Sequence, residues 1–152
     1  MPDTYVEGVS GEKLVFKFGD GGSPTEAFTE ECTINTDRSL EITSDIAVSQ
    51  RANCTDPSKP AKSKRRVKAT DIRFTGAGTA SAASALKLIQ LQLAGAAFNG
   101  KVINDAGTAL HGYTITGKWV IESITMGGTR GEDQTFSIAL AIADTDYTFV
   151  AS

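Results

Sequence analysis

Apolar and polar residues alternate with a period of two over most of this chain, which is the pattern of strands that bury one face. Phe136, Ile138 and Leu140 alternate with small or polar neighbours, and the segment Leu14–Phe18 repeats the pattern. The crossover helices that a parallel sheet requires are not present in the sequence. We therefore predict a mainly β, antiparallel fold, a β-sandwich or barrel flanked by a single α-helix.

Two further patterns predict how the strands connect. Cys32–Thr36 and Leu40–Val48 alternate on either side of Asp37-Arg38, which predicts a hairpin with its turn at that dipeptide. In the long segment Leu110–Met126 the apolar positions change parity after Ile121, which predicts a bulge or bend.

One segment, starting near Ala82, has the composition and spacing of a helix. Thr79 or Ser81 can cap its start, alanines favour it, and Gly95 is a plausible end. Leu86, Ile89 and Leu93 lie at three-then-four spacing, and Leu88 and Leu91 widen this apolar face. We therefore expect the helix to pack on the sheet, with an apolar surface wide enough to be covered on a second side.

Charge is unevenly distributed along the chain. Residues 1–50 carry ten acidic and three basic residues, whereas Arg51–Lys68 carries seven basic residues and one acidic residue. The stretch Gln50–Ser63 contains Pro57 and Pro60 and almost no apolar residue, so we predict a long basic loop over about residues 50–64. It is either a solvated loop or an arm that meets an acidic surface, such as one on a neighbouring copy.

Composition excludes several functional classes. A pI near 5.1 argues against a dedicated DNA-binding domain, and two cysteines with one histidine are too few for a Cys/His zinc site. No apolar run is long enough for a membrane helix. The segment Gly76–Ser81 superficially resembles a dinucleotide loop, but its third small residue is serine. We expect His111 to lie at the surface and both cysteines to be reduced. We also expect one domain over residues 1–152, with no cofactor, no metal and no enzymatic activity.

The order of segments resembles the major tail proteins of long-tailed bacteriophages. The resemblance is carried by Ile72–Gly78, by Tyr113–Ile124 with Gly127-Gly128, and by Phe136–Leu140. It implies hexameric rings stacked into a hollow tube through which DNA passes during ejection. It also implies a tape measure protein in the lumen, contacts with tail terminator and baseplate proteins, assembly in the host cytoplasm, a final location in the virion and no membrane contact.

The resemblance assigns roles to two groups of residues. The loop would be an arm that contacts a neighbouring ring or subunit through Arg51, Lys59, Lys62, Lys64, Arg65 and Arg66. An acidic lining would repel DNA phosphates and let DNA slide. Residues proposed for that lining are Glu41, Thr43 and Asp45. The Ser/Ala face of Thr135–Ala143 is expected, alternatively, to pack against the helix.

Other functions remain open at this stage. A tail terminator, connector or baseplate ring protein would use a similar small β domain. A β-sandwich that binds a glycan or small ligand would need several exposed aromatic residues in one cleft, whereas aromatic residues make up only 7% of the chain and Trp119 follows the core parity.

Overall fold

The computed structural model describes residues 8–19, 26–30, 34, 36–106, 111–144 and 146–151. Within them lie eight strands, one α-helix and one short 3₁₀ helix, η1 (Gly11–Lys13). The strands are β1 (Leu14–Gly19), β2 (Phe28–Glu30), β3 (Asp37–Arg51), β4 (Lys62–Thr79), β5 (Phe98–Asn104), β6 (Tyr113–Gly127), β7 (Thr135–Ile142) and β8 (Thr148–Ala151). The helix α1 (Ala82–Ala94) follows β4.

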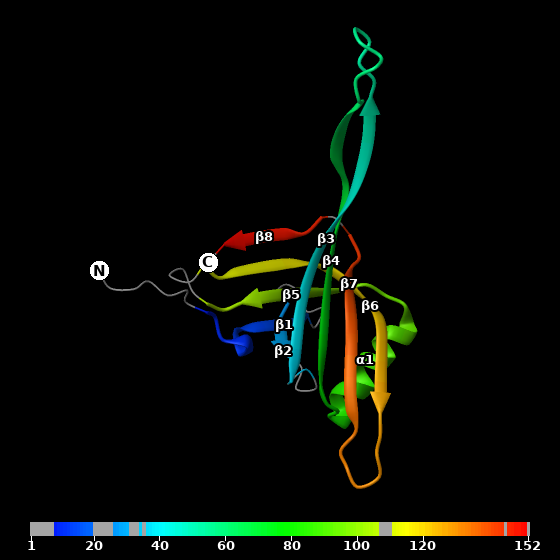
Figure 1. Ribbon diagram of the computed structural model, residues 1–152. Helices are drawn as coiled ribbons and strands as arrows, with labels where there is room; N and C mark the ends of the chain where they lie inside the picture. Colours follow the sequence, from blue (N-terminus) through cyan, green and yellow to red (C-terminus); the bar gives the residue numbers. More distant parts are fainter. Residues whose placement is uncertain are drawn as a thin grey trace, which may run out of the picture.

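All strand pairs are antiparallel, in the order β2-β1-β5-β6-β7-β4-β3, with β8 also paired to β6. The predicted fold class is confirmed, and among the described residues the sheet does not close into a barrel. Figure 1 shows two layers of different strand direction. The first half of β6 runs with β1, β5 and β8, and its second half runs with β7, β4 and β3.

The bend in β6 is a β-bulge, as its change of parity predicts. The register with β7 shifts between Ile121 and Ser123, so Glu122 is the extra residue. Ile121 therefore faces the core before the bulge and Ile124 faces it after the bulge, opposite Leu140 and Ile138. One strand thus serves both layers of the fold.

An aromatic cluster joins the two layers. Phe16 of β1 packs edge-on against Trp119 of β6, with ring centroids 5.2 Å apart, and lies 5.3 Å from Phe74 of β4. Trp119 is fully buried and donates a hydrogen bond from Nε1 to the Gly100 carbonyl at 3.2 Å. The predicted alternation of Phe136, Ile138 and Leu140 is confirmed, since all three side chains are buried.

The helix has the predicted ends, and part of its predicted apolar face is buried. Ser81 occupies the N-cap position and Gly95 ends the helix in the left-handed region, at φ 69°. Ala85 and Leu88 are its buried residues, whereas Leu86 and Leu93 are exposed. Leu88 belongs to the predicted apolar face, whereas the exposure of Leu86 and Leu93 was not predicted, because spacing alone did not distinguish the inner side of this wide face from its outer side. No helix among the described residues has the length and apolar character needed to cross a membrane.

The predicted hairpin turn at Asp37-Arg38 was also wrong. Both residues lie inside β3, opposite Ala77 and Gly76 of β4. Long-range pairing with β4 overrides the local turn preference of Asp37. The hairpin partner of Leu40–Val48 is β4 rather than Cys32–Thr36, and Cys32 lies outside the described residues.

Candidate functional site

The distal parts of β3 and β4 form a hairpin that projects from the body of the molecule (Figure 1). We call residues 46–67 the arm. Strand pairing continues to Arg51 and Lys62, so the connecting loop covers only residues 52–61 and not the predicted 50–64. Arg51, Lys62 and Lys64 therefore lie in strands, because backbone pairing extends beyond the apolar residues that made the strands visible in the sequence.

Side-chain hydrogen bonds order the tip of the arm. Asn53 Oδ1 accepts the backbone N–H groups of Thr55 and Asp56, at 2.9 and 3.1 Å. Asp56 Oδ1 accepts the Ser58 hydroxyl at 2.6 Å. Short polar side chains that bond their own backbone are the usual means of stabilising a turn. The Lys59 N–H donates to the Asp56 carbonyl, so Lys59 belongs to the same turn. Cys54, which follows Asn53, is an exposed free cysteine.

The two faces of the arm differ in chemistry. The register pairs Ile46 with Val67 and Val48 with Arg65, which places these side chains on one face. Val48 is 56% exposed and Val67 is 61% exposed. Alternate positions form the opposite face, which carries Arg51, Lys62, Lys64 and Arg66. The arm is thus an amphipathic hairpin with an aliphatic face and a basic face.

An isolated two-stranded hairpin is marginal in water, and this one carries an added electrostatic cost. Arg51 and Lys62 stand directly opposite each other, where like charges destabilise strand pairing. The sequence identified the basic residues of the arm but not its aliphatic face. The signal was present in the alternation of Ile46 and Val48, which was assigned to a half-buried strand.

The second candidate surface is the side of the sheet β3-β4-β7-β6 that faces away from α1, which we call the open face. Cross-strand partners share a face, so the register defines its members. They are Asp37, Ser39, Glu41, Thr43 and Asp45 of β3, Ala69, Asp71, Arg73, Thr75 and Ala77 of β4, Ser137, Ala139 and Ala141 of β7, and Val120, Ser123 and Thr125 of β6.

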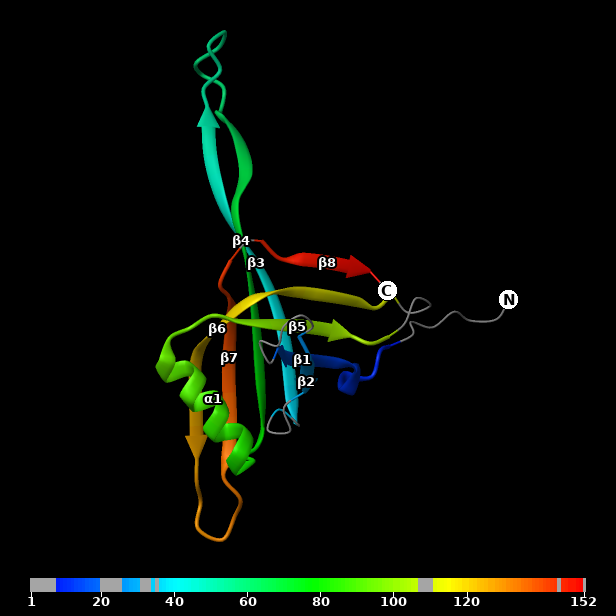
Figure 2. The same cartoon turned by 180° about the vertical axis from the view of Figure 1, so that it is seen from behind.

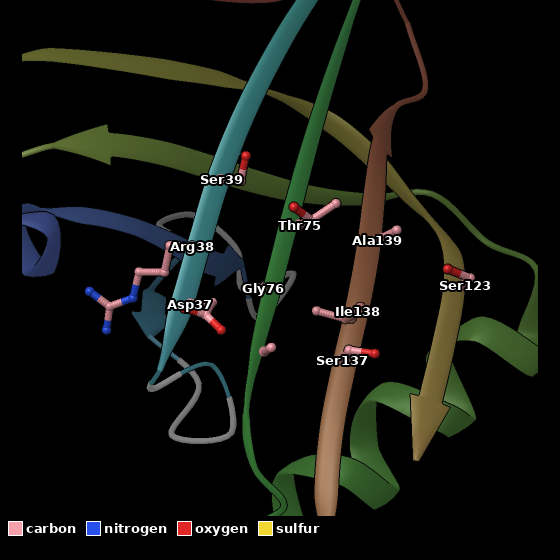
Figure 3. Close-up of a pocket in the computed structure, with 10 residues that line it drawn as sticks. Asp37, Arg38, Ser39, Thr75, Gly76, Ser123, Ser137, Ile138 and Ala139 are labelled. Atoms are coloured by element: carbon pink, nitrogen blue, oxygen red, sulfur yellow. The ribbon is translucent and has the colours of Figure 1, made fainter. Parts of the chain in front are cut away.

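The open face is shallow, carries mostly small side chains and is not covered by the helix. Figure 3 shows Ser39, Thr75, Ala139 and Ser123 in line across the four strands, in a pocket whose lining contains no aromatic residue. Figure 2 shows α1 over the other side of β6 and β7. The alternative expectation that the Ser/Ala face of β7 packs against the helix was wrong. Helix residues Ala85 and Leu88 instead join the core cluster.

The charge of the open face is acidic. Glu41, Thr43 and Asp45 are exposed on it, and Asp37 and Asp71 add two more carboxylates. Arg73 is the one cation among its members. Its side chain reaches Glu122 on β6, with Nη2 2.5 Å from Oε1. The intervening strand β7 presents only Ala139 and Ala141 there, which leaves space for this ion pair across it.

The other chemistry-bearing residues lie apart from both surfaces. His111 is exposed immediately before β6, as expected of a surface histidine. Gly76 and Gly78 lie inside β4, and a Cβ on Gly76 would stand 2.5 Å from Ile34 Cγ2, so this segment is a paired strand and not a dinucleotide loop. Within the described ranges, no group of three or more His, Cys, Asp or Glu residues is placed to hold a metal ion.

Comparison with known proteins gives matches at the level of structure. No protein-family model matches the sequence, and no curated protein matches it. A chain in the tail of an empty gene transfer agent (GTA) particle, solved with C6 symmetry, matches with a TM-score of 0.69 and 17% identity, over 94% of this chain and 99% of that one.

Two further structures match nearly the whole chain. The SPP1 tail tube matches with a TM-score of 0.64 and 9% identity, over 95% of this chain and 80% of that one. A chain of the baseplate of the anti-feeding prophage, 6-fold symmetrised, matches with a TM-score of 0.55 and 13% identity, over 99% and 97% of the two chains. This chain therefore has the tail tube protein fold.

Proposed function

We propose that this chain is a structural subunit of a phage-type tail tube, assembling into six-membered rings that stack around a channel for DNA. The observation that carries the proposal is the sheet β3-β4-β7-β6, which combines an acidic open face with two edges that have no strand partner among the described residues. The tail tube fold and the sixfold symmetry of two matched assemblies support it. The role is structural and requires no catalytic step.

The two edges suit lateral pairing between copies. Every residue of β3 from Asp37 to Arg51 pairs with β4, and β4 is the only strand partner of β3 among the described residues. In the second half of β6, Val120–Gly127 pairs with β7 alone within the same part of the chain. Strand directions alternate across four strands, so β6 of one copy runs antiparallel to β3 of the next. Edge pairing then continues as one antiparallel sheet, and ring closure removes both edges.

The open face supplies the channel lining in this proposal. Glu41, Thr43 and Asp45 would face the lumen together with Asp71. Carboxylates repel DNA phosphates, whereas unpaired lysine or arginine would retain them. The ion pair with Glu122 neutralises Arg73, the one cation on this surface. Small side chains such as Thr75 and Ala139 leave room for a passing duplex or a tape measure protein.

The arm supplies contacts between copies. Arg51, Lys59, Lys62, Lys64, Arg65 and Arg66 would contact a neighbouring subunit or ring, and burial of the aliphatic face would drive the contact. Tail terminator and baseplate proteins would meet the two ends of the tube in the virion.

The test is electron microscopy of concentrated protein, with an arm-less variant. Because Ile46 and Val67 are cross-strand partners, residues 47–66 can be replaced by Asn-Gly, which forms a two-residue hairpin turn. We expect hollow filaments from the wild type. The variant should unfold at a similar temperature and form none. Normal tubes from the arm-less variant would show that the arm does not join the copies.

A ring protein from the baseplate, a terminator or a connector is the second candidate, favoured by the match to a baseplate chain. Such a protein would form single rings at every concentration. Rings that elongate into tubes exclude this alternative, and rings that never elongate support it. A glycan-binding module lacks a comparable argument, since Phe16, Phe74 and Trp119 are buried in the core.

A further inference from the structure

The outer side of α1 carries two leucines that nothing in the described chain covers. Leu86 is 58% exposed and Leu93 is 81% exposed. Lys87 is the only charged residue of the helix. Exposed leucines that lie together on one helix are typical of a contact surface, so this surface is suited to a partner.

A groove runs beside the first half of this helix. We call it the α1 groove. The residues that line it come from α1, from the segment just before α1 and from the β6–β7 hairpin, and they are Ala80, Ala82, Ala85, Leu86, Ile89, Met126, Asp133 and Gln134. Its walls are therefore aliphatic, with one carboxylate, that of Asp133, near the turn between β6 and β7. Met126 is itself exposed and adds a flexible apolar side chain that adapts to an inserted surface.

The arm has the complementary chemistry. Its aliphatic face combines Ile46, Val48 and Val67 with a single cation, Arg65, which is the cross-strand partner of Val48. Branched aliphatic side chains match the α1 groove, and Arg65 matches Asp133 in charge. Both surfaces are exposed in the single chain, and each would lose apolar area to water by contacting the other.

The arm and the α1 groove lie at opposite ends of one molecule (Figures 1 and 2). β4 begins at Lys62 in the arm and ends at Thr79, just before α1, and 18 residues of strand span roughly 60 Å. An arm therefore cannot reach the groove of its own chain. It points to where the groove of a second copy would lie if the two copies were stacked end to end in the same orientation.

We propose that the aliphatic face of the arm docks into the α1 groove of the next copy along the tube axis, with Arg65 placed beside Asp133. The inference rests on the proposed tail tube function and specifies which surfaces join successive rings. The two contact surfaces are different, so the contact is head-to-tail and repeats without closing, which generates a filament. Lateral edge pairing forms each ring, and the arm joins one ring to the next.

Disulfide cross-linking tests the proposed proximity. In a background with Cys32 and Cys54 changed to Ser, Val48→Cys chains are mixed with Leu86→Cys chains, assembled and oxidised. We expect mixed disulfide dimers on a non-reducing gel. The control mixes Val48→Cys with Val150→Cys, an equally exposed aliphatic position on β8, and should give none. Tubes without the Leu86 cross-link would overturn the inference and leave the tail tube proposal intact.

Charge reversal tests the pairing of Arg65 with Asp133. Arg65→Glu and Asp133→Arg should each raise the concentration at which tubes appear by about tenfold, and the double variant should restore it to within about threefold of the wild type. No restoration in the double variant would contradict the pairing. If the wild type forms neither rings nor tubes at any concentration, the proposed function fails and this inference fails with it.

Opposite faces of the arm provide a matched pair of substitutions. Val48→Asp places a charge on the aliphatic face, and Ser49→Asp places the same charge on the other face. We expect Val48→Asp to leave isolated rings and raise the concentration for tube formation at least tenfold, and Ser49→Asp, which stands opposite Lys64 on the basic face, to have a clearly smaller effect. Equal effects of the two variants would argue against docking through the aliphatic face.

Discussion

Gly100 is the position where one added methyl group should disturb the core most directly. It lies in β5 and is buried between β1 and β6. A Cβ at this position would stand 2.5 Å from Phe16 Cζ and 2.9 Å from Trp119 Cδ1. Gly100→Ala therefore forces Phe16 and Trp119 apart, and it strains the hydrogen bond that Trp119 donates to the Gly100 carbonyl.

Overpacking a well-filled core costs about 1–3 kcal/mol, and the crowding of two aromatic rings indicates the upper half of that range. For a chain of this length, about 2 kcal/mol corresponds to a fall in Tm of about 4–8 °C. Thermal unfolding measures the loss, and the fluorescence of Trp119, the single tryptophan, reports whether its environment changes.

Gly128→Ala is the matched control, because Gly128 is exposed and has no atom within 4 Å of an added Cβ. We expect its free energy of unfolding to change by less than about 0.5 kcal/mol. If Gly100→Ala unfolds at the same temperature as this control and leaves the Trp119 emission unchanged, the close packing of the aromatic cluster is wrong.

Two other substitutions test the helix and the open face. Leu88→Ala should lower the free energy of unfolding by about 2–5 kcal/mol, since Leu88 is fully buried. Leu93→Ala should change it by less than about 0.5 kcal/mol in unassembled protein. Similar losses for the two variants in chemical denaturation would show that the helix does not pack on the sheet through Leu88. Removing the ion pair by Arg73→Ala or Glu122→Ala should cost at most about 1 kcal/mol, because both side chains are more than a third exposed, and a larger loss in a thermal melt would show that the pair is structural.

Local patterns predicted much of the fold. The alternation around Ile138 requires a strand with one buried face, and the change of parity after Ile121 has few explanations other than a bulge. The two ends of the helix could also be predicted, because Ser81 and Gly95 have backbone preferences that act within one turn. These features depend on residues that are neighbours in sequence.

Features that depend on distant residues were missed. The turn expected at Asp37-Arg38 is extended in the structure, because Ala77 and Gly76 pair with those residues from about 40 positions away. The inner face of α1 depends on which apolar residues meet the sheet, and a helix with one charged residue gives little information about that choice. The two chemically distinct faces of the arm emerged only when the register paired Ile46 with Val67.

The bulge at Glu122 decides which side chains of β6 face the core and which face the acidic surface. In a regular strand, Glu122 would stand opposite Ala139 and Ser123 opposite Ile138, so Ile124 would project from the acidic surface and Ser123 into the core. The extra residue returns Ile124 to the core side and Ser123 to the acidic side of the sheet. Glu122 itself provides the carboxylate that neutralises Arg73. An insertion or deletion between Ile121 and Ile124 would therefore exchange the two sides of this strand, whereas most substitutions there would leave them in place.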